Sequence, residues 1–393
     1  MFHFQVPVPD WPRAAEILPV GYLIKAIDNV QMLDEAKRHN PNLITDLRHY
    51  VAHQHPGNTL DENIILARQF FDTFIDGTFM EYAHNVDYIE DWNEYFGNTQ
   101  SPEEKQRFIF WAMAAVRVWA LEYRSRPGLG HIRLIVGNTA IGNDIPLDVA
   151  QAASSYDAVV GYHPYWPVRY NNLLPDEWIW YSGRWTVMDD YYRQEGYTVD
   201  WAFTEAGSIR YWLNGGVSLD PYGGWRHPEC HDYNLNEYLL KIKYWMDNWY
   251  AWNQSNNDRA LPPVLFNSNL GGGAWAHFNL VQPQLDIIAE FVSRWVPQTP
   301  EPPGGECRGA PRIQYHRVYN VLSSHIDEAT AQSIFVDAMR HNKQTVGFSY
   351  DDAGIGDLDN RLARLHGIPA NERQTFIEWY NQNYPGVVIE FVD

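Results

Sequence analysis

The chain has 393 residues, 45% of them hydrophobic, and a formal net charge of −20 at pH 7. The mean hydropathy of −0.44 argues against a membrane protein, and no apolar run approaches the roughly 18 residues that a spanning helix needs. The acidic excess disfavours nucleic acid and anionic membranes as partners, because binding to phosphate groups requires a basic surface. The composition leaves the oligomeric state open.

The first six residues, MFHFQV, lack the basic stretch and long apolar core of a signal peptide. We therefore expect the protein to be cytoplasmic, or secreted with a leader already removed. Cys230 and Cys307 are the only cysteines of the chain. They could form one bridge, but their spacing does not require it and there is no CxxC motif.

Strand-like and helix-like segments alternate through the first 298 residues, a pattern typical of a parallel α/β fold. Several of the strand-like segments are nearly continuous apolar runs, as expected for parallel strands covered on both faces. The eight expected strands are Phe2–Val6, Tyr22–Ile27, Leu43–Leu47, Val86–Trp92, Ile132–Gly137, Ala158–Tyr162, Trp201–Thr204 and Val264–Asn267. Eight strands separated by helices predict a (β/α)8 barrel, the TIM barrel fold.

Helical segments fill the intervals between these strands. The clearest begins at Pro102 and extends to about Tyr123, with Ser101 as its N-cap and Glu104 completing a capping box. Other helices are expected at residues 61–83, 237–252 and 284–295. The interval 163–199 is too long for a short connection, so we expect a functional insertion after the sixth strand.

The composition changes after the barrel. Residues 296–312 contain five prolines and three glycines, which is typical of a linker. The remainder alternates strand, helix, strand, strand, helix and strand, which indicates a small α/β module. Three parts are therefore predicted: a barrel over residues 1–298, a Pro/Gly-rich linker over 299–312 and an accessory module over 313–393.

Two glutamates follow strand-like runs and open into loops. Glu94 ends the string Asp91-Trp92-Asn93-Glu94, and Glu205 lies in Thr204-Glu205-Ala206-Gly207. A carboxylate at the end of a buried strand is partly desolvated, so that its pKa and its orientation can be tuned. Two such carboxylates suffice to cleave a glycosidic bond, since one protonates the leaving oxygen and the other attacks or activates water.

The spacing of these glutamates fits a barrel. They lie 111 positions apart, from 94 to 205, and one βα unit of an eightfold barrel takes about 31 residues. About three units therefore separate them, which places them after the fourth and seventh strands. All strands of such a barrel end on one face, where the active site is built, so the two side chains are expected to meet on that open face.

In order and strand position, Trp92-Asn93-Glu94 and Thr204-Glu205-Ala206-Gly207 resemble the signature of clan A glycoside hydrolases. These are retaining β-glycosidases on a (β/α)8 barrel. The resemblance covers about residues 1–298. It implies that Glu94 is the general acid/base, that Glu205 is the nucleophile, and that Asn93 donates a hydrogen bond to the sugar 2-hydroxyl group.

Four further positions agree with this resemblance. His163 and Tyr165 follow the sixth strand, where clan members often place an imidazole or aromatic group near the nucleophile. Tyr165 is expected to hydrogen-bond Glu205. Trp275, near the eighth strand, corresponds to a platform tryptophan under the reacting sugar. Arg48 corresponds to an arginine that orients the nucleophile, although it lies on strand three and the clan's usual arginine lies one strand earlier.

Two more residues are assigned to substrate binding. Asn138 ends the fifth strand and is expected to line the same face. Trp166 is one of seven tryptophans between residues 162 and 225, a segment where uniform placement of the chain's 17 would give about three. Sugar rings stack on indole, so such tryptophan-rich loops suit glycans, although a hydrophobic loop core is the alternative.

The function predicted from the sequence is a retaining β-glycoside hydrolase that cleaves a β-linked oligo- or polysaccharide and needs no metal or organic cofactor. One alternative is a non-catalytic carbohydrate-binding barrel. Another is a metal-dependent hydrolase that uses His49, His53 and His55, because three imidazoles within seven residues could ligate zinc. No HExxH glutamate accompanies these histidines.

Overall fold

A computed structural model describes most of the first 295 residues and parts of the remainder. The described residues are 1–4, 11–97, 100–140, 143–167, 182–209, 224–226, 234–267, 274–281, 283–295, 317–322, 344–347, 361–383 and 387–392. The predicted linker at 299–312 and both cysteines lie outside them. The chain divides into two compact units, and the boundary falls between Pro302 and Pro303.

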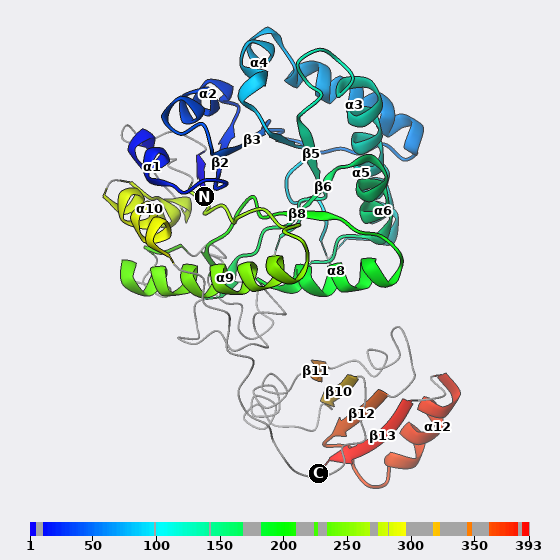
Figure 1. The fold of residues 1–393 in the computed structure, drawn as a ribbon. Helices are drawn as coiled ribbons and strands as arrows, with labels where there is room; N and C mark the ends of the chain where they lie inside the picture. The colour runs from blue at the N-terminus through cyan, green and yellow to red at the C-terminus, as the bar shows by residue number, and fades with distance from the viewer. Residues whose placement is uncertain are drawn as a thin grey trace. The chain divides into compact units, whose positions relative to one another are not determined.

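Seven strands of the first unit form one parallel sheet in sequential order. Figure 1 shows them at the centre of this unit with the helices around them. These strands are β1 (Phe2–Phe4), β2 (Leu23–Ile27), β3 (Ile44–Arg48), β4 (Tyr88–Glu90), β5 (Arg133–Val136), β6 (Val159–Gly161) and β8 (Asp200–Ala202). Each overlaps the corresponding segment expected from the sequence, and β8 is the seventh barrel strand.

The eighth segment closes the sheet through isolated bridges rather than a full strand. Leu265 bridges both Phe2 of β1 and Ala206 beyond the end of β8, each in parallel. The Val264 amide donates to the Phe203 carbonyl at 2.8 Å, and the Leu265 amide donates to Met1 at 2.9 Å. This closure confirms the predicted (β/α)8 barrel.

Helices alternate with the strands, as the sequence pattern predicts. They are α1 (Trp11–Ile17), α2 (Val30–His39), α3 (Leu60–Phe74), α4 (Gly77–Tyr82), α5 (Pro102–Val118), α6 (Leu147–Tyr156), α8 (Arg184–Gln194), α9 (Leu235–Ser255) and α10 (Gln284–Arg294). Short turns of helix are η1 (Ala83–Asn85), η2 (Trp119–Tyr123) and η3 (Ala274–Phe278), and a two-stranded sheet pairs β7 (Trp166–Pro167) with β9 (Ser208–Ile209). None of the helices in the described part of the chain is long and apolar enough to cross a bilayer.

Helix caps explain where two of the predicted helices begin. The Ser101 side chain accepts from the Glu104 amide at 3.1 Å and Pro102 occupies the first turn, as expected for the start of α5. The single helix expected over residues 61–83 is wrong. Asp76 caps a new helix by accepting from the Phe79 amide at 2.7 Å, so α3 and α4 are separate.

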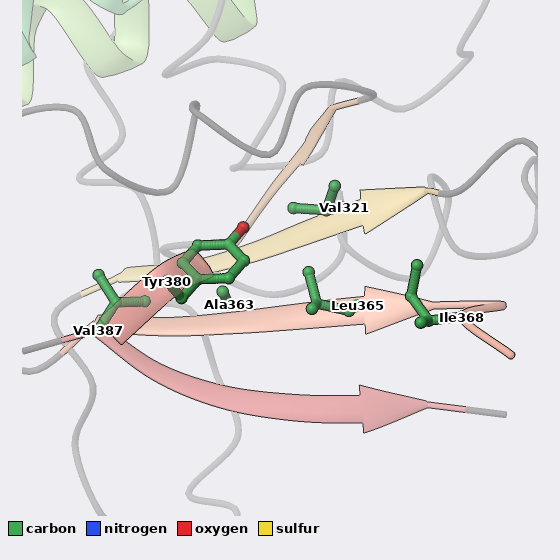
Figure 2. Packing of buried hydrophobic residues seen from close by; sticks show 6 residues of the cluster. All are labelled: Val321, Ala363, Leu365, Ile368, Tyr380 and Val387. Carbon is green, nitrogen blue, oxygen red and sulfur yellow. The ribbon is translucent and has the colours of Figure 1, made fainter. Parts of the chain in front are cut away.

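The second unit contains its own parallel sheet and core. Its strands are β10 (Arg317–Leu322), β11 (Gln344–Gly347), β12 (Arg361–His366) and β13 (Val387–Val392), in the order β11-β10-β12-β13, and α12 (Arg373–Asn383) precedes β13. A cluster of buried side chains from these elements forms the core shown in Figure 2: Val321, Ala363, Leu365, Ile368, Tyr380 and Val387. The small C-terminal α/β module predicted from the sequence is therefore present.

Candidate active site

Hydrogen bonds of Asp91 hold the loop that carries Glu94, directly after β4. The Asp91 amide continues the ladder by donating to the Ile135 carbonyl at 3.0 Å. The Asp91 carboxyl group accepts from the Tyr95 hydroxyl at 2.6 Å and from the Trp111 indole at 3.2 Å. Glu94 itself has a φ of 43°, in the left-handed region that non-glycine residues rarely adopt. Strained backbone of this kind clusters at functional sites.

Asp91 is an unusual acid for a structural position. It is completely buried, and this burial together with the nearby Glu90 raises the pKa of the Asp91 carboxyl group well above its ordinary value. The hydrogen bonds from Tyr95 and Trp111 oppose the shift but do not reverse it. The neutral acid is therefore favoured beneath the Glu94 loop.

Glu205 follows β8 and is 4% exposed. Arg48 donates to its Oε1 at 2.5 Å, and the Tyr165 hydroxyl donates to its Oε2 at 2.9 Å. Burial alone would favour the neutral acid, but His163, Arg48 and Lys25 hold the pKa of Glu205 well below its ordinary value. The structure thus keeps Glu205 ionised and fixes both of its oxygens. Its side chain is nearly buried where β8 ends.

Glu94 and Glu205 meet at His163. The Nδ1 atom of His163 lies 2.7 Å from Glu94 Oε1 and 3.7 Å from Glu205 Oε2, and its Nε2 lies 3.1 Å from the Thr204 hydroxyl. One oxygen of Glu94 and one of Glu205 lie within 4.8 Å of each other. The Glu94 side chain is 35% exposed, against 6% for Glu205. The two carboxylates therefore share a site but have different environments.

Arg48 and Asn93 join the two halves of this site. Arg48 ends β3, as expected, and donates to Asn93 Oδ1 as well as to Glu205. Because Arg48 engages the Asn93 carbonyl oxygen, the amide's NH2 group is the end that remains to donate. Burial and the nearby carboxylate of Glu205 raise the pKa of Tyr165 well above its ordinary value, so its hydroxyl stays a donor.

Charged side chains inside the barrel lie beneath Glu205, and the sequence interpretation missed them. They are His3, Lys25, Asp46 and Glu90, all 0% exposed. Lys25 forms an ion pair with Glu90 at 2.6 Å and lies 3.5 Å from Glu205. His3 and Lys25 are each the single polar residue of an apolar strand, and a lone charge at such a position is the signal that would have revealed them.

Two residues assigned to substrate binding lie in buried positions, and the side chain of a third is not described. Asn138 is 0% exposed and donates to Glu90 Oε2 at 3.0 Å, so it belongs to the interior network and does not line the open face. Trp166 is 1% exposed and packs against Tyr238 with ring centroids 5.9 Å apart, which leaves no open face for a sugar. Trp275 lies in η3, and its side chain is outside the described residues.

The histidine cluster does not gather as a metal site among the residues that the structure describes. His49 Nδ1 lies 2.6 Å from Asp28 Oδ1, and the rings of His53 and His55 stack with centroids 5.9 Å apart. Among these residues, the one group whose ligand atoms are close enough together to hold a metal ion is Glu94, His163 and Glu205. Arg48 and Lys25 already neutralise Glu205, and their positive charges oppose a cation there.

Comparisons with known proteins concern the fold. No family model matches the chain, and no curated protein matches it. Similar solved structures include PbGH5A, a glycoside hydrolase family 5 enzyme from Prevotella bryantii B14, at 12% identity over 74% of this chain and 86% of that chain, with a TM-score of 0.44. A GH5-4 broad specificity endoglucanase from Clostridium acetobutylicum aligns at 10% identity over 73% and 90%, with a TM-score of 0.46.

An AP endonuclease, family 2, from Brucella melitensis is also similar, at 13% identity over 70% of this chain and 96% of that chain, with a TM-score of 0.34. Because one barrel hosts many reactions, the activity has to be argued from the site.

Proposed function

We propose that the protein is a retaining β-glycoside hydrolase in which Glu205 is the nucleophile and Glu94 the general acid/base. The observation that carries the proposal is the approach of their carboxylate oxygens to within 4.8 Å. In retaining enzymes the two carboxyl groups lie about 5–5.5 Å apart, whereas inverting enzymes leave about 6.5–9.5 Å for a water molecule. The spacing supports direct attack by one carboxylate.

The environment of Glu205 suits a nucleophile. Arg48 and Tyr165 bind one oxygen each, so the carboxylate is ionised and held in one rotamer before substrate arrives. In the first step a Glu205 oxygen attacks the anomeric carbon, and the bond to the leaving oxygen breaks as that oxygen takes a proton from Glu94. The product of this step is a covalent glycosyl-enzyme.

The environment of Glu94 suits an acid that later acts as a base. Its side chain is partly exposed, so water reaches it after the leaving group departs. In the second step Glu94 removes a proton from this water, which attacks the anomeric carbon and releases Glu205. The free NH2 group of Asn93 supports its proposed contact with the sugar 2-hydroxyl group.

The substrate class rests on the resemblance of the sequence motifs. A β-linked oligo- or polysaccharide is proposed, and the net charge of −20 supports a neutral glycan over a polyanionic one.

The stereochemistry of the product tests this proposal. Aryl β-glycosides and neutral β-glycans are screened for turnover, and proton NMR follows the anomer that forms first from an active substrate. The β-anomer is expected first, since two displacements restore the configuration. The control variants are Glu205→Gln, which should lose turnover, and Glu122→Gln at an exposed surface ion pair, which should retain it. Release of the α-anomer first, or equal activity of both variants, would contradict the proposal.

A further inference from the structure

Lys25 is the most unusual residue beneath the site. It is 0% exposed on β2, with Ile24 and Ala26 as its neighbours. Its ammonium group lies 2.6 Å from Glu90 Oε1, 3.3 Å from the Thr204 carbonyl oxygen and 3.5 Å from Glu205 Oε1. A buried ammonium group is costly unless carboxylates and hydrogen bonds compensate it, so these contacts account for its position.

Lys25, Arg48, Glu90 and Glu205 form a group of two positive and two negative charges, to which a protonated Asp46 adds no third negative charge. Burial and the adjacent Glu90 raise the pKa of Asp46 well above its ordinary value, which favours its protonated form. A proton on Asp46 prevents a third carboxylate from competing for Lys25. The positive charge of Lys25 is therefore available to both Glu90 and Glu205.

Among the described residues, the charged and titratable groups that face Glu205 come from several strands and strand ends. His3 of β1 lies 3.9 Å from its Oε1, and burial together with Lys25 lowers the pKa of His3 well below its ordinary value, which favours the neutral ring. Lys25 of β2, Arg48 of β3, Glu94, and His163 and Tyr165 beyond β6 also face Glu205. Glu90 of β4 and Asp46 of β3 act on Lys25 and Arg48 instead. Arg48 also binds Asn93, whereas Lys25 binds the backbone carbonyl of the residue before Glu205.

We propose that Lys25 is a positioning residue for Glu205: anchored on Glu90, its ammonium group supplies a second fixed positive charge to the Glu205 carboxylate and fixes the backbone at Thr204. Its charge acts on Glu205 whatever the reaction is, and its part in catalysis rests on the proposed function. Arg48 aligns the carboxylate with Asn93, while Lys25 holds the strand end from within the barrel.

Direct titration of Glu205 tests the proposal without a substrate. The protein is labelled with [δ-13C]glutamate, and the Glu205 carboxyl signal is assigned by its absence in Glu205→Gln. In Lys25→Met the midpoint of this signal should rise by about one pH unit or more, because an opposite charge at this range shifts a carboxyl group by about one to three units. An unchanged midpoint would overturn the proposal.

Two further variants separate a charge effect from general disruption. Glu90→Gln breaks the same ion pair from its other end but leaves Lys25 beside Glu205, so it should not raise the midpoint. Asp189→Asn neutralises a fully buried carboxylate that pairs with Arg259 at 2.8 Å, and in the described part of the chain Asp189 has no direct contact with Glu205. It should lower thermal stability and leave the midpoint unchanged. Equal upward shifts in all three variants would mean that loss of packing, not charge, sets the midpoint.

If Lys25→Met does not fold, the double variant Lys25→Met/Glu90→Gln removes both charges of the pair and leaves neither unpaired. Its midpoint is then compared with that of Glu90→Gln alone and should lie higher.

On an activated aryl β-glycoside, the acidic limb of the kcat/KM profile should move with the NMR midpoint. If the protein hydrolyses a glycoside but the Glu205 titration midpoint is unchanged in Lys25→Met, the proposed role of Lys25 is wrong and the proposed function still stands. If the Glu205 titration midpoint rises in Lys25→Met but the wild-type protein hydrolyses no glycoside, the charge effect is supported and the proposed function is not.

Discussion

Two chemically identical side chains acquire different properties from their surroundings. Glu205 is buried among cations, and its pKa lies well below its ordinary value. Glu94 is partly exposed and has one close partner, His163. Pairs of acids whose environments differ in this way are typical of sites where one acid accepts a covalent bond and the other exchanges protons.

The division of roles predicts how loss of Glu94 depends on the leaving group. Glu94→Ala should slow glycosides with poor leaving groups by about 100-fold or more, because they need proton donation, and spare activated aryl glycosides. Added azide should restore turnover by attacking the glycosyl-enzyme and yield a β-glycosyl azide. Steady-state kinetics across a series of aryl glycosides checks this. Uniform loss for all leaving groups would remove Glu94 from the acid role.

Asp91 predicts an effect of pH on stability. Its pKa is raised in the folded state, so above its unfolded value of about 4 the unfolded chain releases a proton that the folded protein retains. This acid therefore makes folding less favourable as the pH rises toward its folded pKa. The free energy of unfolding of Asp91→Asn relative to wild type should increase by about 1.4 kcal/mol per pH unit over that window. Urea unfolding at several pH values measures it, and a flat difference would show that Asp91 is ionised.

The residues whose contacts span the site could be predicted from the sequence, but the charged residues inside the barrel could not. Arg48 ends a strand, Glu94, Glu205 and Tyr165 follow strand ends, and the closed barrel makes those ends converge. Lys25 sits within a strand, where its neighbours Ile24 and Ala26 make the segment look like ordinary core. Its direction into the barrel depends on strand register, which emerges only when the sheet closes.

At the scale of elements, the strands were predictable because parallel strands covered by helices are apolar along their whole length. The break between α3 and α4 was not, because Asp76 and Gly77 can both occur within a helix and only the cap geometry separates the two. The eighth segment was predicted as a strand over Val264–Asn267, and it closes the sheet through isolated bridges instead.

The contact of β5 with β6 carries a prediction about Gly161. A Cβ atom at this position would overlap Asn138 Oδ1 and lie 2.9 Å from the Ile135 side chain. Gly161→Ala should therefore destabilise the protein by about 1–3 kcal/mol, the usual cost of overpacking. In the Asn138→Ala background the same change should cost less, since the obstructing amide is gone. A double-mutant cycle of urea unfolding measures this, and additive effects would contradict the contact.

The chain as a whole consists of two compact units. Among the described residues, the contacts of the site come from residues of the first unit between His3 and Glu205, and the second unit has its own buried core. The described sheet of the second unit contains none of the residues proposed to take part in the reaction. Its role is therefore expected to be support of the barrel or of a glycan.

A truncation tests this division. A chain ending after about residue 299 should fold and retain turnover of a small soluble glycoside, because both carboxylates and their partners remain. Circular dichroism with thermal melting checks folding in parallel with kinetics. A folded but inactive truncate would show that the second unit completes the active site. Activity retained on small glycosides but lost on polymer would indicate that this unit docks substrate.

The left-handed backbone at Glu94 has a consequence for how this position can change. An L-amino acid with this φ costs roughly 1–2 kcal/mol, whereas glycine adopts it freely. Glu94→Gly should therefore be more stable than Glu94→Ala by about 1 kcal/mol, as judged by chemical unfolding, although both lack the carboxyl group. Equal stability would mean that the loop relaxes once the side chain is removed. Selection for a sturdier protein and selection for a faster one favour different residues at position 94, so drift toward glycine here would mark a lineage that has abandoned the reaction.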